Sequence, residues 1–357
     1  MRRRGLLGMA AGAAVASGAG SAFRVRMERA MAAARVPGMA VGRVERGALA
    51  GVDTYGDCTE DTVFQAASLT KQVTGYMVLA LRDAGKLSLE RTLVSYVDEI
   101  GDERGRRATL SHALSHSTGF PNWRSEGDLA AAFEPGQEWR YSGEGYVYLQ
   151  RIIEKVTGRG IGAAAEEMVF RPLGMEASAM RWRGKWEGRY AEPHGRDGRP
   201  RREWDKTGRA VERLAERLGR EPKYEDSILL LREAGMAAVP NNVLPNGAAS
   251  LMTTAKDYGR FVAAAMKNPE LRRARVTMGE GKGWQLGWGL GWGIERVDGR
   301  EYLWQWGDNP GYKNIVFAEP GKGKAVVVFT NGDGGGRVYE RVVRQETGQE
   351  HPALFRI

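Results

Sequence analysis

Apolar and polar residues alternate with different periods along this chain. Residues 23–35 have helical spacing, whereas residues 38–56, GMAVGRVERGALAGVDTYG, read as two short strands joined by a turn near Gly47. From residue 68 to about residue 267 the patterns are mostly helical. The first half of the chain therefore predicts a short strand region followed by a long helical one.

Strand-like patterns return from about residue 284 onward, in the segments WQLGWGLGWGI, EYLWQW, NIVFAE and AVVVFT, and a helix is predicted over 338–345. In the first segment tryptophan and leucine occupy every second position of residues 284–292, and glycines fill the positions from 287 to 293 between them. A side-chain period of two is that of a strand, and a bare glycine face lets other backbone approach closely. This segment predicts strand structure throughout.

Strands near both ends with helices between them predict an α/β protein of the α+β type. We expect an antiparallel sheet built from both chain ends, flanked by helices, with a mostly helical lobe inserted in its middle. The expected division is an export signal over 1–22, then a single catalytic domain over 23–357, with an α/β lobe (23–66 plus 270–357) and a helical lobe (67–269) that includes a basic insertion (181–239). A site between two lobes would lie where residue 68 joins them.

The segment FQAASLTKQVTGYMVLA, residues 64–80, begins a helix with almost no polar face, and Gly85 supplies its stop. Ser68 and Lys71 stand three residues apart at its start. Burying an unpaired ammonium costs several kcal/mol, so a lysine one turn into a buried helix needs a reason. A structural alternative is that Ser68 caps the helix and Lys71 extends to solvent.

Two later segments strengthen a chemical reading. FEPGQEWRYSGEGYVYLQ places Tyr141 in a loop before a helix that starts near Gly145, and EYLWQWGDNPGYKN leads from a strand into a glycine-rich turn. With these motifs in this order, the chain resembles serine hydrolases related to class C β-lactamases and penicillin-binding proteins. The resemblance runs from about Val36 to Phe355, is thinnest between Arg181 and Val239, and includes the phrases LSHALSHSTGFP, VFRPLGM, NGAASLMTTAKDYGRF and HPALF.

The chemistry gives the first two residues their roles. A serine hydroxyl needs an adjacent base, and a helix start exposes N–H groups that can stabilise a developing oxyanion. Ser68 would be the nucleophile and, through its backbone N–H, one oxyanion donor, while Lys71 would exchange its proton. The resemblance implies that Tyr141 completes the proton relay and protonates the leaving group, and that the backbone N–H of Asp308 is the second donor.

Substrate-binding positions implied by the resemblance are Gly143, Gln305, Trp306 and Gly307. Two of them depart from the family pattern. Many relatives have lysine or histidine where this chain has Gln305, and many have asparagine where it has Gly143. A neutral amide offers a weaker hydrogen bond to a carboxylate than a charged group does, so we expect uncharged short-chain esters as substrates and weak or absent β-lactam hydrolysis.

Several other patterns do not indicate a site. Lys206-Thr207-Gly208 spells the third β-lactamase motif, but it lies in the insertion and leads into a helix rather than along an edge strand. His112 and His116 are more typical of core or hydrogen-bonding histidines than of a metal site, and Cys58, the one cysteine, cannot form an intramolecular disulfide. We expect no cofactor and no metal.

Charge adds two expectations. The net charge is +9, and residues 181–223 carry 14 basic and 8 acidic residues. This stretch is typical of a solvated insertion. Its tryptophans allow a second interpretation, in which it forms a lid over the substrate, and a third is that it binds an anionic polymer. Arg3-Arg4 followed by Leu6 and Leu7, and a small-residue stretch to about Ala22, predict an export signal of twin-arginine type and hence a periplasmic or extracellular enzyme.

The favoured function is an exported serine hydrolase that cleaves an ester or amide, with a small-molecule ester or amide or a cell-wall peptide as substrate. Alternatives are a true β-lactamase or D-alanyl-type peptidase, and a non-catalytic cell-wall-binding homologue. No nucleic-acid partner is expected, because no recognisable nucleic-acid-binding motif accompanies the basic stretch, and no transmembrane span is expected after removal of the signal.

Overall fold

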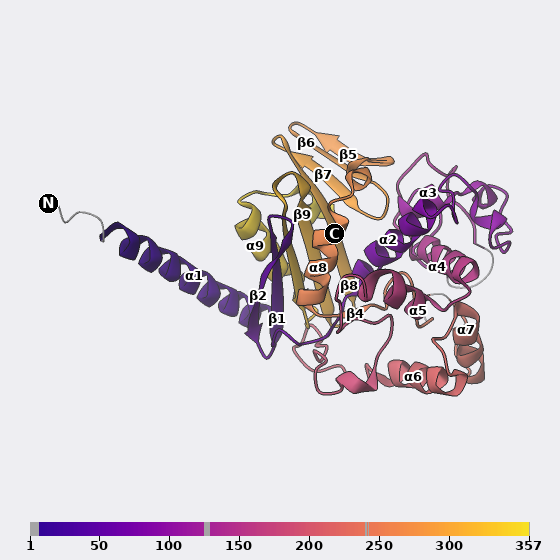
Figure 1. The fold of residues 1–357 in the computed structure, drawn as a ribbon, viewed down its shortest axis with the longest axis horizontal. Coiled ribbons are helices and arrows are strands. Elements are labelled where there is room, and N and C mark those ends of the chain that lie inside the picture. The colour runs from indigo at the N-terminus through magenta and orange to yellow at the C-terminus, as the bar shows by residue number, and fades with distance from the viewer. Residues whose placement is uncertain (1–6, 125–128, 240, 242, 357) are drawn as a thin grey trace.

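The computed structural model describes residues 7–124, 129–239, 241 and 243–356. Arg3 and Arg4 of the expected twin-arginine signal lie outside these ranges. Within them, α1 (Leu7–Ala34) runs through the expected cleavage region near Ala22 without a break and extends beyond the sheet toward its N-terminus (Figure 1). No described helix is long and apolar enough to cross a membrane.

An antiparallel sheet is the centre of the fold, and its eight strands in the described part of the chain have the order β2-β1-β10-β9-β8-β7-β6-β5. Their bounds are β1 Gly38–Glu45, β2 Ala48–Gly56, β5 Val276–Gly281, β6 Trp284–Trp288, β7 Gly293–Val297, β8 Arg300–Asn309, β9 Tyr312–Glu319 and β10 Lys324–Thr330. Strand β1 pairs directly with β10, Met39 lying opposite Thr330. The two chain ends therefore build one sheet, as the sequence predicts.

Helices cover both faces of the sheet (Figure 1). Strand β10 shows why: Val326 and Val328 pack into the apolar cluster that includes Met27 and Met31 of α1, together with α9 (Gly336–Thr347). Val327 and Phe329 point the other way, into a second cluster. A continuous run of β-branched and aromatic residues suits a strand that is buried on both faces.

The helical lobe lies beside the sheet (Figure 1) and consists of short and long helices joined by loops. Its helices are α2 Thr70–Asp83, α3 Leu110–Leu114, α4 Gly143–Thr157, α5 Ile161–Ala165, α6 Lys206–Leu218 and α7 Tyr224–Glu233. A small ribbon of β3 (Phe64–Gln65) and β4 (Met252–Thr253) connects the lobe to the sheet. We expected residues 67–269 to belong to this lobe, but α8 (Ala255–Ala265) packs against β1, β2 and β10.

The tryptophan- and glycine-rich segment is not one strand. Strand β6 ends at Trp288, a turn follows, and β7 begins at Gly293. The backbone reverses at Gly291, which has φ of +88°, and Gly289 N–H donates to the carbonyl of Trp292 at 2.8 Å. The alternation therefore continues through the turn, and Trp288 and Trp292 belong to different apolar clusters.

The basic insertion has a packed interior of its own. Trp182 and Trp186 are 3% and 4% exposed, and they pack with Val63 and Met252. These tryptophans therefore serve the packing of the insertion and do not form an exposed lid surface.

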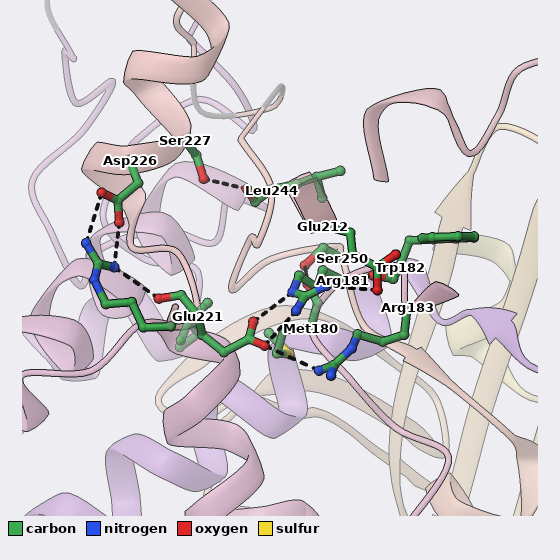
Figure 2. Close-up of polar contacts among 12 residues, drawn as sticks. Met180, Arg181, Trp182, Arg183, Glu212, Glu221, Asp226, Ser227, Leu244 and Ser250 are labelled. Atoms are coloured by element: carbon green, nitrogen blue, oxygen red, sulfur yellow. Dashed lines mark hydrogen bonds and ion pairs between the residues drawn. The ribbon is translucent and has the colours of Figure 1, made fainter. Parts of the chain in front are cut away.

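Opposite charges tie the insertion together. The guanidinium of Arg181 binds both carboxylate oxygens of Glu221 at 2.9 Å, and Arg183 reaches the same carboxylate at 3.3 Å (Figure 2). The Glu221 carboxylate therefore offsets part of the positive charge of Arg181 and Arg183.

Candidate active site

A strained turn presents Ser68 ahead of α2. Ser68 is the middle residue of a 3-10 turn (Ala67–Leu69), and Ala67 has φ of +52°, which is unusual for a residue with a side chain. The hydroxyl of Thr70 donates to the Ala67 carbonyl at 2.6 Å and accepts from the Leu251 N–H at 3.0 Å, so the turn is anchored from two sides. Strain of this kind is often found at functional sites.

Lys71 is the second residue of α2 and is 1% exposed. Its Nζ donates to Ser68 Oγ at 3.0 Å and to the carbonyl oxygen of Ala248 at 2.9 Å. Burial disfavours the charged ammonium and lowers the pKa of Lys71 to about 7. The amine can therefore be neutral near neutral pH, as a general base must be. The alternative in which Ser68 caps the helix and Lys71 extends to solvent is wrong, because the Lys71 side chain points into the protein.

Tyr141 approaches the same serine from the loop before α4. Its ring lies 4.9 Å from Lys71 Nζ. Burial raises the pKa of Tyr141, while hydrogen bonds with Ser68 and Gln305 act in the opposite direction. The phenol therefore keeps its proton at neutral pH and can act as a donor, whereas Lys71 is the better base.

His116 supports Tyr141 from behind. It is fully buried, its ring centroid is 4.3 Å from that of Tyr141, and its Nδ1 accepts the backbone N–H of Ser142 at 3.1 Å. Burial and the nearby Lys71 hold the pKa of His116 well below its usual range. The neutral ring positions the residue that follows Tyr141. His116 is therefore a buried, hydrogen-bonding histidine, as its sequence pattern predicted.

Gln305 faces inward from β8 and is fully buried. Its Nε2 donates to the Tyr141 hydroxyl at 3.1 Å and lies 3.4 Å from the Ser68 carbonyl oxygen, while its buried Oε1 has no hydrogen-bond partner among the described residues. Trp306 packs beside the same phenol, with ring centroids 4.8 Å apart. The amide of Gln305 is thus directed at Tyr141 rather than outward.

Strand β8 passes the serine turn at very short range. Its pairing with β7 ends at Trp304, so the residues after it run along the turn. A Cβ on Gly307 would lie 2.3 Å from the Ala66 carbonyl oxygen, which only glycine avoids. The next residue, Asp308, is exposed, and its carboxylate pairs with Lys313. The backbone just before Asp308 therefore lies against the turn that carries Ser68.

The segment after the insertion supplies a contact that sequence reasoning missed. The Ala248 carbonyl holds Lys71, and the adjacent Gly247 is bound through its carbonyl to Thr74 Oγ1 at 2.6 Å and through its N–H to Gln150 Oε1 at 2.8 Å. The segment NGAAS was part of the family resemblance, but every residue has a backbone carbonyl, so residue identity could not predict this contact with Lys71.

The structure also shows where the sequence patterns that did not indicate a site lie. Lys206 begins α6 in the insertion, so Lys206-Thr207-Gly208 lies on a helix. His112 Nδ1 accepts the Thr109 N–H in a capping box, and Cys58 is buried with its pKa raised to about 12 by burial. Among the described residues no group of three or more potential ligands could hold a metal ion.

Comparison with known proteins agrees with this geometry. The β-lactamase family profile matches residues 23–349. Esterase EstB of Burkholderia gladioli is 27% identical over 243 residues, covering 59% of this chain and 58% of the esterase. Penicillin-binding protein 4 of Amycolatopsis lactamdurans is 27% identical over 297 residues, covering 77% of this chain and 73% of that protein. The chain thus spans little more than half the length of the esterase.

Solved structures share the fold at low identity. A D-alanine carboxypeptidase AmpC from Burkholderia cenocepacia superposes with a TM-score of 0.67 at 19% identity, covering 92% of this chain and 99% of that one. A penicillin-binding protein homologue from Pyrococcus abyssi gives 0.69 at 19% identity, covering 95% and 80%. The mixed α/β fold predicted from the sequence is confirmed. Given a profile match over most of its length, the chain belongs to the β-lactamase family, and serine hydrolase is the enzyme class that this membership supports.

Proposed function

We propose that this protein is an exported serine hydrolase that cleaves an ester or amide through an acyl-enzyme at Ser68. One observation carries the proposal. The Ser68 hydroxyl lies 3.0 Å from the amine of a fully buried lysine, and burial lowers the pKa of that lysine to about 7. A hydroxyl paired with a base that is half neutral near pH 7 is an activated nucleophile.

Acylation follows from this pair. Neutral Lys71 takes the Ser68 proton as Oγ attacks the substrate carbonyl carbon, and the carbonyl π electrons move onto oxygen. The Ser68 and Asp308 backbone N–H groups would stabilise that oxyanion, each such donor typically being worth about 3 kcal/mol of barrier. The oxyanion then re-forms the carbonyl and expels the alkoxide or amine.

Tyr141 would deliver the proton that the leaving group needs. It stays protonated at neutral pH, and Gln305 donates to its oxygen, which leaves the phenolic hydrogen free for Ser68 Oγ or the departing atom. Lys71 then returns its proton to Tyr141. In deacylation a water molecule attacks the acyl carbon, and the same groups restore the Ser68 hydroxyl.

Esters are the favoured substrates, with weak or absent β-lactamase activity. An esterase is among the relatives, and the amide of Gln305 is engaged with Tyr141, so it offers little to a substrate carboxylate. A cell-wall peptide remains the alternative, because a penicillin-binding protein is also a relative. The expected location is periplasmic or extracellular.

Fluorophosphonate labelling tests the proposal directly. We expect the unmodified protein to gain one adduct in intact-mass analysis, and peptide mapping to place it on Ser68. Ser68→Ala should take up no label and lose turnover of chromogenic esters while its thermal unfolding stays close to that of the parent. Absence of labelling in the parent would overturn the acyl-enzyme and favour a non-catalytic binder.

A further inference from the structure

Gly143 begins α4 in ordinary helical conformation, so no positive φ explains the glycine. The explanation is steric. A Cβ built on Gly143 would lie 2.5 Å from Cη2 and 2.7 Å from Cζ2 and Cζ3 of Trp123. The indole therefore occupies the space that any side chain at position 143 would need.

The loop that carries Trp123 is fixed to the first turn of α4. The Asn122 carbonyl accepts the N–H groups of Gly143 and Glu144 at 2.9 and 3.0 Å, and the Asn122 side chain also accepts from Gly143 at 2.9 Å. On the other side, the Arg124 N–H donates to the fully buried Glu144 carboxylate at 2.8 Å. Both neighbours of Trp123 are thus held, and the indole is a preorganised surface.

This surface lies against Gly143, two residues after Tyr141. The Ser142 hydroxyl donates to the Pro121 carbonyl at 2.8 Å, so the Trp123 loop runs along the segment that carries Tyr141. Trp123 itself is partly exposed. It packs against the apolar cluster that contains Val327 and Phe329 and against a smaller cluster that contains Tyr224 and Leu231 of α7. An acyl group on Ser68 that extends past Tyr141 toward Gly143 meets an indole and no side-chain amide.

From this arrangement we infer that Trp123 is a specificity-determining residue that binds the acyl group of the substrate. The inference rests on the proposed acyl-enzyme at Ser68 and narrows its substrates to esters with a flat apolar acyl group, of the benzoyl kind. Aromatic rings pair favourably in offset or edge-to-face geometry, whereas an acyl-side amide would lose its water hydrogen bonds against the indole.

The test compares p-nitrophenyl benzoate with p-nitrophenyl acetate, which share a leaving group. We expect Trp123→Ala to lower kcat/KM for the benzoate about tenfold more than for the acetate, and Trp123→Phe to keep most of the benzoate preference. Equal losses on both esters, or an unchanged preference in Trp123→Ala, would overturn the role of Trp123.

A steric cycle provides a second readout that does not depend on turnover. Gly143→Ala should lower the melting temperature in the parent, because the new Cβ meets the indole, and should lower it less in the Trp123→Ala background. The same penalty in both backgrounds would show that the indole does not occupy this space. Fluorophosphonate labelling of each variant separates the role of Trp123 from the acyl-enzyme at Ser68. Intact labelling with an unchanged preference for the benzoate overturns only the role of Trp123. Absence of labelling in the parent overturns the proposed function.

Discussion

At the scale of single residues, the buried amine of Lys71 is the feature with the strongest chemical consequence. Burial is the cause of its lowered pKa, and no carboxylate in the described part of the chain is paired with the amine. Its partners are a hydroxyl and a carbonyl, which accept from the neutral amine as well as from the ammonium. A lysine in this setting serves proton transfer better than ion pairing.

The pH dependence of activity tests this directly. Because the base must be neutral and the pKa of Lys71 is about 7, kcat/KM for a neutral ester should rise from pH 5 to pH 8 with a midpoint near 7. Initial rates measured across this range give the profile. Lys71→Ala should cost at least about 100-fold, the usual scale for a general base. Lys71→Arg keeps a long cationic donor that does not deprotonate, so substantial activity in that variant would contradict the assignment.

Gln305 is a positioning residue for Tyr141. Gln305→Met keeps a similar length but removes the donor to the phenol, so we expect kcat to fall by about tenfold, a loss of roughly one charge-neutral hydrogen bond, with a smaller change in KM. Gln305→Lys restores a donor and should recover part of kcat and raise cephalosporin turnover relative to ester turnover. Steady-state kinetics on both substrates measure this, and unchanged kcat in Gln305→Met would exclude the positioning role.

At the scale of elements, the insertion depends on buried charge pairs. The Arg181 and Glu221 side chains are 6% and 18% exposed and hydrogen bond through both pairs of atoms. Removing one partner of such a pair leaves the other charge buried and costs about 3–5 kcal/mol.

We therefore expect Glu221→Gln to lower the free energy of unfolding by about 3 kcal/mol, measured by urea denaturation. Arg181→Met in the same protein should recover part of the loss, because it removes a buried cation that has lost its nearest carboxylate and keeps only the longer contact with Glu212 at 3.7 Å. Arg199→Gln is the matched control, since Arg199 is 85% exposed and its pair with Asp197 contributes little. A Glu221→Gln protein as stable as the control would contradict the role of the pair.

At the scale of the whole molecule, the position of α1 bears on the proposed export. Its later part packs on the sheet through Met27 and Met31 and beside α9. The expected cleavage region near Ala22 lies before these contacts. Removal of the residues that precede it would therefore leave the packed part of α1 in place.

Replacing Arg3 and Arg4 by lysine tests the twin-arginine route. We expect the precursor to remain in the cytoplasm of a bacterial host that has this pathway, while the parent yields a shorter protein in the periplasmic fraction. Immunoblotting of cell fractions and intact mass of the exported form are the measurements. Unchanged export of the lysine variant would show that this route is not used.

Local pattern alone determined much of this protein. The apolar stripe of residues 64–80 predicted α2 and its stop at Gly85, and Lys86 N–H closes that end on the Leu81 carbonyl. Period-two runs predicted the strands that join the two chain ends, because side-chain period reports which faces are buried. The order of Ser68, Lys71 and Tyr141 predicted residues that the structure brings together.

Tertiary structure decided what depends on contacts between distant segments. The alternation over residues 284–293 predicted strand structure throughout, but the chain turns at Gly291. The alternation continues through this turn because Trp288 and Trp292, on either side of it, are buried in two different apolar clusters. The carbonyl of Ala248 on Lys71 is a backbone group, and every residue has one. Position 143 requires glycine because of the indole of a residue 20 positions earlier in the chain. Position 307 requires glycine because of the carbonyl of Ala66. Sequence pattern reports each residue's local periodicity, whereas the lowered pKa of Lys71 and the shape around Ser68 arise from what the folded chain packs against them.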